Sequence, residues 1–410
     1  MSTAYTVEVE TIFHGRGRNE CWFEPTVALV PPGRNGAAAG VIATVSQLVG
    51  NDMGPHHYTW TRNAGRTWSN PAESQALQVT PLENDVFEKP WLAPFYHHAS
   101  DTLLMIGRTC HTLDVLPTPG VKGETHAIWA PRAKGMTLRA DLIYSRWEPQ
   151  REDFVPWQRV AWQGLLADAG QVNLYTSDVC QRVEPDEGNI LCPVTLSGGD
   201  DERGRAAVLR LAWDGETLRA VELGNVLECN EVRGYHEPSL VRHNGRFLLT
   251  LRNDIRGYVA ESADGLHFAT PRPWTFDDGT ELGSYNTQQH WLVQGETLFL
   301  VYTRRSDLSD GVVRHRAPLF MAEVDPERLC VRRATERVLI PGRGARMGNF
   351  CTLNVSADEA WVVTGEWLQR VVPGYAKGMP FFVDAARGDS PYNRIQYIGD
   401  LLLARVRFGG

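Results

Sequence analysis

A short structural unit recurs along this chain, and its clearest copy spans residues 236–268. It begins His-Glu-Pro-Ser-Leu-Val, passes through an Asn-Gly turn into Phe-Leu-Leu-Thr-Leu-Arg, and ends in Ser-Ala-Asp-Gly-Leu-His-Phe. Short apolar runs separated by turns rich in Gly, Asn and Asp favour antiparallel strands. A repeated unit of this kind is typical of a β-propeller blade. We therefore expect an all-β fold, a single-domain β-propeller over residues 1–410.

Six such units can be located by their first strands. These begin near Glu24, Lys89, Asp178, His236, Thr287 and Gly348. The second strands are predicted at Ala37–Val45, Thr102–Arg108, Asn189–Leu196, Arg246–Arg252, Thr297–Arg304 and Ala360–Glu366. The final apolar run, Leu401–Phe408, can pair with the opening run, Tyr5–Phe13, which would close the ring and remove both free edges. Residues 112–137 contain several Pro and Gly and are predicted to be a loop insertion over one face.

Composition excludes several classes of protein. The net charge is −8 and there is no basic tract, so no nucleic-acid partner is expected. No apolar run approaches the roughly 18 residues that span a membrane, so no membrane partner is expected. The seven cysteines are scattered and the first residues do not form a secretory signal. We expect a cytoplasmic protein, or a secreted or periplasmic one if a leader has been removed, as a monomer or small homo-oligomer.

Two segments contain the residues expected of a turn that is stabilised by hydrogen bonds from its own side chains. One is Thr-Arg-Asn-Ala-Gly-Arg-Thr-Trp at residues 61–68, and the other is Ser-Ala-Asp-Gly-Leu-His-Phe at residues 262–268. An Asn or Asp side chain can bond turn amides, Gly supplies positive φ, and the aromatic residue can pack between blades. Both resemble the aspartate box of sialidase-type propellers, and we expect them to be structural.

Charged residues end four of the predicted second strands: Arg108, Arg252, Arg304 and Glu366. In a propeller these ends can meet at the mouth of one central cavity. Arginine binds carboxylate or sulfate in a bidentate manner, so the pattern predicts a pocket for an anionic sugar. The alternative is that these arginines form ion pairs between blades or lie on a solvated rim.

Histidines form a second group of candidates. His56 and His57 precede the first of the two turns, His111 follows Arg108, and His236 and His290 open adjacent blades. Imidazole transfers protons near neutral pH, so His57 and His111 are candidate catalytic residues, while His56 and His236 are candidate substrate-binding residues. His236 and His290 could also hold a structural Ca or Zn ion in the central channel. The alternative for each is a buried, hydrogen-bonded histidine.

A polar and aromatic stretch joins two blades at residues 274–291. Its Tyr285 and Gln289 are candidates for stacking on a sugar ring and bonding its hydroxyls, and the alternative is packing between blades. Tyr302 is a candidate proton donor. The carboxylate candidates are Glu366 and Glu237.

Several of these motifs carry a family resemblance: Gly-Tyr-His-Glu-Pro-Ser-Leu, Leu-Arg-Asn-Asp, Trp-Thr-Phe-Asp-Asp-Gly-Thr-Glu-Leu-Gly-Ser-Tyr-Asn-Thr-Gln-Gln-His-Trp, Val-Tyr-Thr-Arg-Arg and Arg-His-Arg-Ala-Pro-Leu-Phe. They resemble bacterial sialidase-like propellers close to enzymes that cleave L-rhamnosyl-glucuronate linkages, namely α-L-rhamnosidases, rhamnose–glucuronate lyases and ulvan lyases. The resemblance is densest over residues 234–350, and it implies seven blades rather than the six counted. Trp22-Phe23-Glu24-Pro25 stands where a true exo-sialidase would have Phe/Tyr-Arg-Ile-Pro.

The resemblance implies an L-rhamnosyl-α-1,4-D-glucuronate lyase that acts by β-elimination on an anionic oligosaccharide or polysaccharide. Arginine would neutralise the uronate carboxylate, a histidine would take the C5 proton, and a tyrosine or second histidine would protonate the leaving oxygen. No cofactor is required for that chemistry. One alternative is a glycoside hydrolase, an α-L-rhamnosidase or a sialidase-like enzyme, acting on the same kind of glycan. Another is a non-catalytic sugar-binding propeller.

Overall fold

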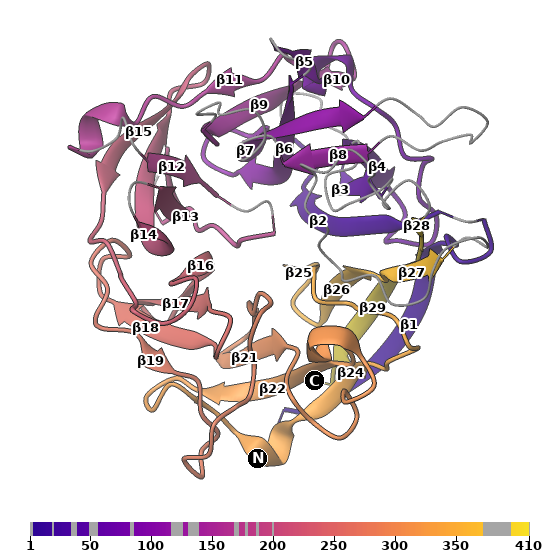
Figure 1. The fold of residues 1–410 in the computed structure, drawn as a ribbon, viewed down its shortest axis with the longest axis vertical. Coiled ribbons are helices and arrows are strands. Elements are labelled where there is room, and N and C mark those ends of the chain that lie inside the picture. Colours follow the sequence, from indigo (N-terminus) through magenta and orange to yellow (C-terminus); the bar gives the residue numbers. More distant parts are fainter. Residues whose placement is uncertain are drawn as a thin grey trace.

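The computed structural model describes residues 3–18, 20–33, 39–48, 56–82, 86–115, 126–129, 139–167, 172–176, 179–185, 188–198, 201–371 and 395–409. Within these residues, six antiparallel sheets of three or more strands stand around a common axis (Figure 1). The fold is therefore a six-bladed β-propeller. The count of six units in the sequence is confirmed, and the seventh blade implied by the family resemblance is wrong.

The blades follow one another along the chain. Blade 1 contains β2 (Trp22–Val30), β3 (Gly40–Gln47) and β4 (His56–Thr61). Blade 2 contains β6 (Val86–His97), β7 (Thr102–Val115) and β9 (Leu142–Glu148), with β5 (Thr80–Pro81), β8 (His126–Trp129), β10 (Asp153–Phe154) and β11 (Gln158–Arg159) along its edges. Blade 3 contains β12 (Val172–Tyr175), β13 (Asn189–Gly198), β14 (Asp201–Trp213) and β15 (Leu218–Leu223).

The second half of the ring repeats the plan. Blade 4 contains β16 (His236–His243), β17 (Arg246–Arg252), β18 (Tyr258–Ser262) and β19 (Arg272–Pro273). Blade 5 contains β20 (His290–Gln294), β21 (Thr297–Tyr302), β22 (Leu319–Asp325), β23 (Cys330–Val331) and β24 (Arg337–Ile340). Blade 6 contains β25 (Phe350–Asn354), β26 (Glu359–Gly365), β29 (Leu401–Phe408) and β1 (Tyr5–Phe13). A separate hairpin pairs β27 (Leu368–Val371) with β28 (Ile395–Ile398), and short 3₁₀ turns lie at Gln75–Leu77, Gln163–Leu165, Val313–His315 and Arg333–Thr335.

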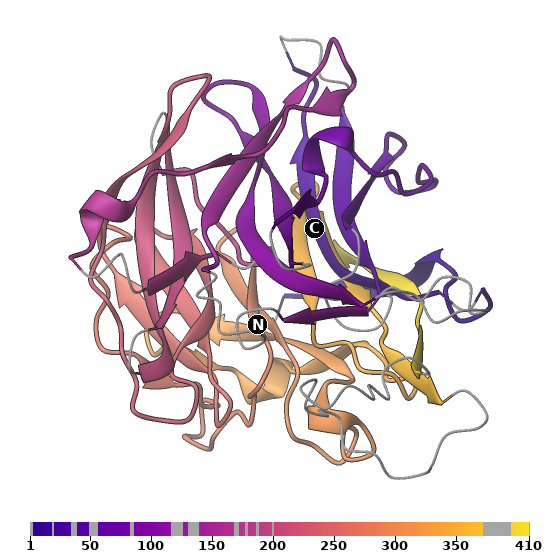
Figure 2. The same ribbon diagram turned by 45° about the horizontal axis from the view of Figure 1, so that its top comes forward.

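The two ends of the chain close the ring in blade 6. Strand β1 pairs antiparallel with β29, from Tyr5 opposite Phe408 to Phe13 opposite Leu401, and β29 pairs in turn with β26. Figure 2 shows β1 and the final strand side by side in the turned view. This pairing confirms the closure expected from the sequence. It pairs β29 on both sides, whereas β1 has one partner and is the outer edge strand of the blade, so only one of the two free edges is removed.

The hydrophobic core is divided among the contacts between neighbouring blades. Trp22 of blade 1, for example, packs in one cluster with Trp361 and Leu403 of blade 6. Phe299 of blade 5 lies in another with Phe350 of blade 6. Full burial of a large apolar side chain contributes about 1.5–3 kcal/mol, so these interfaces supply most of the driving force that holds the ring together.

The inner strands of three blades are joined by one polar side chain. Gln181 Nε2 donates to Trp291 O at 2.9 Å and to Thr352 Oγ1 at 3.1 Å, while Gln181 Oε1 accepts from Trp291 N at 2.6 Å and from Ser239 Oγ at 3.2 Å. These partners lie on β16, β20 and β25, strands that contact one another around the axis. Gln181 therefore ties blades 4, 5 and 6 together near the axis.

The two side-chain-bonded turns follow the third strands of blades 1 and 4. Asn63 Oδ1 accepts from Thr67 N at 3.0 Å, and Asp264 Oδ1 accepts from Leu266 N at 2.9 Å and His267 N at 2.8 Å. Gly65 takes a φ of 76°, which favours glycine. These contacts hold the turns locally and involve no residue at the axis.

The predicted insertion at 112–137 is partly sheet. Strand β7 runs on to Val115, and β8 pairs with this extension, because the alternating residues there continue the ladder. Residues 116–125 and 130–138 lie outside the described residues. No helix in the described part of the chain has the length and apolar character needed to cross a lipid bilayer.

Candidate active site

A partly buried ion pair lies where blade 4 meets the axis. Arg252, the last residue of β17, is opposite His236, the first residue of β16, and its Nη1 donates to Glu237 Oε2 at 2.5 Å. Glu237 occupies a bulge in β16 with a φ of 45°. Burial acts to raise the pKa of Glu237, but the Arg252 guanidinium outweighs it and lowers that pKa to about 2. Glu237 is therefore a carboxylate at neutral pH.

Tyr175 and His236 form a second contact beside this pair. The Tyr175 hydroxyl lies 3.4 Å from His236 Nδ1, and His236 Nε2 donates to Arg233 O at 2.8 Å. A carbonyl only accepts, so Nε2 carries the proton and Nδ1 has the lone pair that faces Tyr175. Burial, reinforced by Arg233, lowers the pKa of His236 to about 4, so the imidazole is neutral at neutral pH. A Cβ at Gly204 would lie 2.5 Å from His236 Nε2, so glycine makes room for the ring.

Arg108 lies over the same tyrosine. Its Cζ is 4.9 Å from the centre of the Tyr175 ring and 5.2 Å from that of Trp91. Burial raises the pKa of Tyr175, opposed in part by the Arg108 charge. The phenol consequently keeps its proton at neutral pH.

Arg316 brings a further guanidinium from the loop between β21 and β22. It is buried, its Nη1 donates to Asn349 Oδ1 at 3.2 Å, and its Nη2 donates to Asn286 O at 2.5 Å. Both acceptors are neutral, and Arg316 forms no salt bridge with a carboxylate among the described residues. A Cβ at Gly348 would lie 2.6 Å from Arg316 Cδ, so the glycine allows this approach.

The Arg316 guanidinium is repelled by the charges of other arginines. Burial, followed by the charges of Arg252 and Arg314, lowers the pKa of Arg316 to about 9, while Glu237 opposes that shift. The guanidinium remains protonated at neutral pH, at a cost in free energy that a bound anion would relieve.

We call six residues the axial cluster: Arg108, Tyr175, His236, Glu237, Arg252 and Arg316. Within the cluster three arginines stand beside one carboxylate, Glu237, and Asp254 Oδ1 lies 3.8 Å from Arg252 Nη2 just outside it. A site of this composition attracts an anion, with a phenol and a neutral imidazole beside it for proton transfer.

Glu24 occupies the position in blade 1 that Glu237 occupies in blade 4. Both precede proline, both have a left-handed backbone with φ of 47° and 45°, and both lie in a register shift of an inner strand. Asn349 Nδ2 donates to Glu24 Oε1, and Asn349 Oδ1 accepts from Arg316. A second carboxylate is thus connected to the axial cluster through one amide.

Arg304 and Tyr302 do not join the axial cluster. The Arg304 guanidinium forms a bidentate pair with Glu336, with Nε to Oε2 at 2.8 Å and Nη2 to Oε1 at 2.7 Å. The buried Tyr302 hydroxyl donates to Glu336 Oε2 at 2.6 Å. The expectation that Arg108, Arg252 and Arg304 meet is therefore wrong for Arg304, because β21 ends at Tyr302 and the next residues turn away toward β22 and β24.

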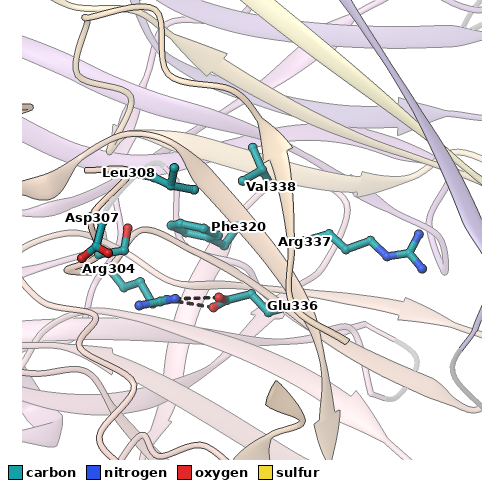
Figure 3. A pocket seen from close by; sticks show the side chains of 8 residues that line it. Arg304, Asp307, Leu308, Phe320, Glu336, Arg337 and Val338 are labelled. Atoms are coloured by element: carbon teal, nitrogen blue, oxygen red, sulfur yellow. Dashed lines mark hydrogen bonds and ion pairs between the residues drawn. The ribbon is translucent and has the colours of Figure 1, made fainter. Parts of the chain in front are cut away.

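Arg304 instead lines a pocket of about 490 Å³ on blade 5. Figure 3 shows its paired guanidinium and the Glu336 carboxylate on one side, with Phe320, Leu308 and Val338 above them. Arg304 is paired with Glu336 there, and the other charged lining residues, Arg337 and Asp307, are of opposite sign, so the pocket offers no excess positive charge for an anionic sugar.

Glu366 is held by two arginines in a group that we call the closing cluster: Arg16, Arg343, Glu366 and Asp400. Arg16 donates to both Glu366 oxygens at 2.7 Å, and Arg343 donates to the same oxygens at 2.9 and 2.6 Å. Arg343 also donates to Asp400 Oδ2 at 2.8 Å. The proposed catalytic role of Glu366 is not compatible with this geometry, because the buried carboxylate has no oxygen left for a substrate.

The catalytic histidine candidates have carboxylate partners of their own. His57 Nε2 lies 3.5 Å from Glu73 Oε1, and His111 Nε2 lies 3.2 Å from Glu88 Oε1. Neither contact includes a residue of the axial cluster, so the placement expected for His57 and His111 is not observed. His56 is nearer, because its ring packs edge-on against Trp91, which lies under Arg108. Burial lowers the pKa of His56 to about 3.

The remaining candidates divide between packing and the loop of blade 5. Gln289 is buried and bonds Thr287 O and Thr250 Oγ1 at 2.8 and 3.1 Å, which supports a packing role. His290 Nδ1 lies 2.9 Å from Ser239 Oγ, and burial lowers its pKa to about 3. Tyr285 bonds His315 on the loop that carries Arg316.

A metal at His236 and His290 has no geometric support. His236 uses one ring nitrogen on Arg233 and the other on Tyr175, and His290 uses Nδ1 on Ser239. Among the described residues, no three His, Cys, Asp or Glu side chains are grouped to hold an ion. A structural metal stays a prediction.

Sequence reasoning missed Tyr175 and Arg316. Tyr175 ends an inner strand, the position from which the cluster is built, and Arg316 stands two residues beyond Arg314 in Arg-His-Arg. Recurrence of Glu-Pro at residues 24–25 and 237–238 was the signal for the two equivalent carboxylates.

No protein-family model and no curated protein matches this sequence. Solved structures of sialidases match its fold. The NanB sialidase from Streptococcus pneumoniae, in complex with an ammonioethanesulfonate compound, has a TM-score of 0.60 at 9% identity, over 97% of this chain and 70% of that one. Trypanosoma rangeli sialidase in complex with 2,3-difluorosialic acid has a TM-score of 0.52 at 12% identity, over 98% and 60%.

The match extends around the whole ring but not over the whole of those enzymes. Against another T. rangeli sialidase structure, with a TM-score of 0.50, the chain spans 55% of the other chain's length. At 12% identity the likeness shows a sialidase-like propeller fold.

Proposed function

We propose that this chain is a carbohydrate-active enzyme that binds the carboxylate of an acidic sugar in the axial cluster and cleaves the adjoining glycosidic bond by β-elimination. The observation that carries the proposal is Arg316, a buried guanidinium that donates to the neutral oxygens of Asn349 and Asn286. A carboxylate offers such a group a bidentate, charge-assisted partner. Following the sequence resemblance, the favoured substrate is an L-rhamnosyl-α-1,4-D-glucuronate linkage.

In the proposed reaction the uronate carboxylate lies against Arg316 and Arg252. Their positive charges stabilise the negative charge that develops as C5 gives its proton to a base of the site, which passes it on to solvent. The electron pair of the C5–H bond forms a C4–C5 double bond, and the bond from C4 to the glycosidic oxygen breaks. The leaving oxygen takes a proton from Tyr175, whose phenol is kept protonated by burial. Water then restores that proton.

Tyr175 can change partner for this step. Its hydroxyl is 3.4 Å from His236 Nδ1, a long hydrogen bond that it can exchange for one to the substrate oxygen. Proton transfer by a positioned side chain typically contributes about 10²–10⁴-fold in rate. The arginine contacts are expected to supply a large share of the remaining acceleration.

A hydrolase on the same kind of glycan is the second candidate, and Glu237 is the observation that favours it. Because its pKa is about 2, Glu237 is an anion that suits a nucleophile or general base and does not suit a general acid. A hydrolase would then need its acid elsewhere, and Glu24, which is connected to Arg316 through Asn349, is the candidate. The 2,3-difluorosialic acid named for one T. rangeli sialidase structure is also a carboxylated sugar.

The reaction type is tested by incubating the protein with a rhamnosyl-glucuronate oligosaccharide and, separately, a sialyl-oligosaccharide. We expect growth of the ultraviolet absorbance of an unsaturated uronate on the first. Release of free rhamnose or sialic acid without that absorbance would replace the lyase by the hydrolase. Binding by calorimetry with no product from either would leave a sugar-binding propeller and reject both enzymes.

A further inference from the structure

A tyrosine and a histidine outside the axial cluster are in close contact on blade 5. The Tyr285 hydroxyl lies 2.6 Å from His315 Nδ1, and His315 Nε2 lies 3.7 Å from Asp310 Oδ1. The Arg305 guanidinium stacks on the phenol, with Cζ 3.7 Å from the ring centre. Four polar residues from two segments, one before β20 and one between β21 and β22, therefore form one group around the Tyr285 hydroxyl.

The backbone holds this group in an unusual conformation. Asn286, Arg314 and His315 have φ of 56°, 60° and 52°, in the left-handed region that residues with a side chain rarely adopt. Such residues each cost about 1–3 kcal/mol and persist only where surrounding contacts impose them. The arrangement of Tyr285 and His315 is consequently imposed by the fold rather than by local preference.

The same backbone connects this group to the proposed carboxylate site. Asn286, which follows Tyr285, accepts a hydrogen bond from Arg316 through its carbonyl at 2.5 Å, and Arg316 directly follows His315. Arg316 is thus adjacent in sequence to His315, and its hydrogen-bond partner Asn286 is adjacent in sequence to Tyr285. A sugar carboxylate bound by Arg316 would therefore lie near both members of the Tyr285–His315 pair.

The contacts define the direction in which a proton can move. Asp310 beside Nε2 favours the tautomer with its proton on Nε2, which leaves the Nδ1 lone pair to accept the Tyr285 proton. The Arg305 charge over the ring then stabilises the negative charge that the phenol oxygen gains. Tyr285, His315 and Asp310 are thus arranged as in sites where a histidine activates an oxygen and a carboxylate lies beside the other ring nitrogen.

We propose that Tyr285 is the catalytic base, that its proton passes to His315 Nδ1, and that Asp310 and Arg305 are positioning residues. This inference rests on the proposed lyase function and deepens it. The Tyr285 oxygen takes the C5 proton of the uronate, the C5–H electron pair forms the C4–C5 double bond, and the C4–O bond breaks. Tyr175 protonates the leaving oxygen. The proton held by His315 leaves to solvent, so one proton is taken from carbon and one is delivered to oxygen.

The first experiment compares Tyr285→Phe with Tyr144→Phe as a matched control. Tyr144 also donates its hydroxyl, to Gln158 at 3.0 Å, but lies in blade 2. We expect kcat for uronate elimination to fall by about 10²–10⁴-fold in Tyr285→Phe, with Kd for the oligosaccharide changed less than about threefold. Retention of wild-type kcat, or an equal loss of binding and turnover, would reject the catalytic base.

The second experiment tests the role of His315. His315→Ala should lose kcat, and added imidazole should restore part of it, whereas Tyr285→Phe should not respond. A readout that needs no substrate is labelling of Tyr285 by an aryl fluorosulfate, followed by mass spectrometry. We expect labelling about tenfold slower in His315→Ala than in wild type, because the histidine no longer accepts the phenol proton. Equal labelling would overturn the relay.

The outcomes separate this inference from the proposed function. If the wild-type protein forms no unsaturated product, the lyase and its base are both rejected. If wild type and Tyr285→Phe form the product at the same rate, the lyase stands and only the role of Tyr285 is rejected.

Discussion

The axial cluster and the closing cluster are both built from arginine and carboxylate, but they differ in charge balance. In the closing cluster, Arg16 and Arg343 face Glu366 and Asp400, and each Glu366 oxygen accepts from both guanidiniums. In the axial cluster, three arginines stand beside one carboxylate, Glu237, with Asp254 Oδ1 3.8 Å from Arg252 Nη2 outside the cluster. A balanced network has completed its hydrogen bonds and holds the fold together, whereas an unbalanced one retains the capacity to bind an anion.

The positions of the two clusters agree with these roles. The closing cluster joins the segment after β1 to the end of β26, so it fixes the place where the chain ends meet. The axial cluster brings together residues of blades 2, 3, 4 and 5: Tyr175, His236 and Arg252 stand at strand ends, Arg108 lies within β7, and Arg316 lies in the loop between β21 and β22. Charge balance, rather than the presence of arginine, is thus the feature that separates a structural site from a candidate binding site.

The largest effect is expected from Arg316→Gln. Removal of the guanidinium should lower kcat/KM on the acidic sugar by about 10²–10³-fold, the usual cost of losing one group that stabilises developing charge. The melting temperature should stay the same or rise, because an uncompensated buried charge is lost. Arg219→Gln, which removes an exposed arginine paired with Asp214, is the matched control. A large loss of stability with unchanged activity would show that Arg316 is a structural residue and not a ligand-binding one.

Glu366→Gln should have the opposite signature. It leaves Arg16 and Arg343 without their main counter-charge, and breaking a buried pair costs about 3–5 kcal/mol. Because both arginines are partly exposed, we expect the lower end, about 3 kcal/mol, in urea unfolding. The folded fraction should keep wild-type kcat/KM. A loss of activity in fully folded protein would restore Glu366 as a catalytic residue.

The axial cluster should also make the fold sensitive to acid. Burial holds the pKa of His236 at about 4, below the value of about 6.5 for an exposed histidine. The unfolded chain therefore binds a proton first, so the stabilisation is complete above pH 6.5 and is lost as pH falls from about 6.5 to about 4. His236→Asn should remove roughly 1 kcal/mol of the difference in unfolding free energy between pH 7 and 5.5. An unchanged pH dependence would contradict the burial of a neutral imidazole.

Protonation of Glu237 should extend this loss of folding stability to lower pH. Its pKa of about 2 lies below that of an exposed glutamate, so its contribution is present above about pH 4.5 and disappears as pH falls toward 2. Glu237→Gln should flatten that part of the unfolding profile, measured by denaturant titration at successive pH values. A profile as steep as that of wild type would show that Arg252 does not hold Glu237 as an anion.

The smallest effect is expected from a pair that belongs to neither cluster. Arg210 Nε and Glu222 Oε2 lie 2.9 Å apart across β14 and β15, with Glu222 47% exposed. Glu222→Gln should change the unfolding free energy by less than about 1 kcal/mol, since water competes for both charges. A cost as large as that of Glu366→Gln would mean that burial does not distinguish the closing cluster.

Local sequence pattern determined the blades of this protein. Alternating apolar residues and Gly- or Asn-containing turns located the six units, and β17 has the predicted bounds Arg246–Arg252. The pairing of Tyr5–Phe13 with Leu401–Phe408 was also predictable, because two apolar strands without partners remained and a ring leaves them one solution. These features depend on period-2 alternation and turn chemistry, which are properties of neighbouring residues.

Tertiary structure alone decided which polar residues meet. Arg252 and Arg304 end equivalent strands in the sequence, yet one faces Glu237 at the axis and the other faces Glu336 on the side of blade 5. Glu366 was unavailable as a catalyst because Arg16, 350 residues away in sequence, covers it. Tyr175 and Arg316 joined the axial cluster through a strand end and a left-handed loop that no local pattern predicts. Contacts of this kind depend on bulges, loop paths and distant charges, so they cannot be predicted from sequence periodicity.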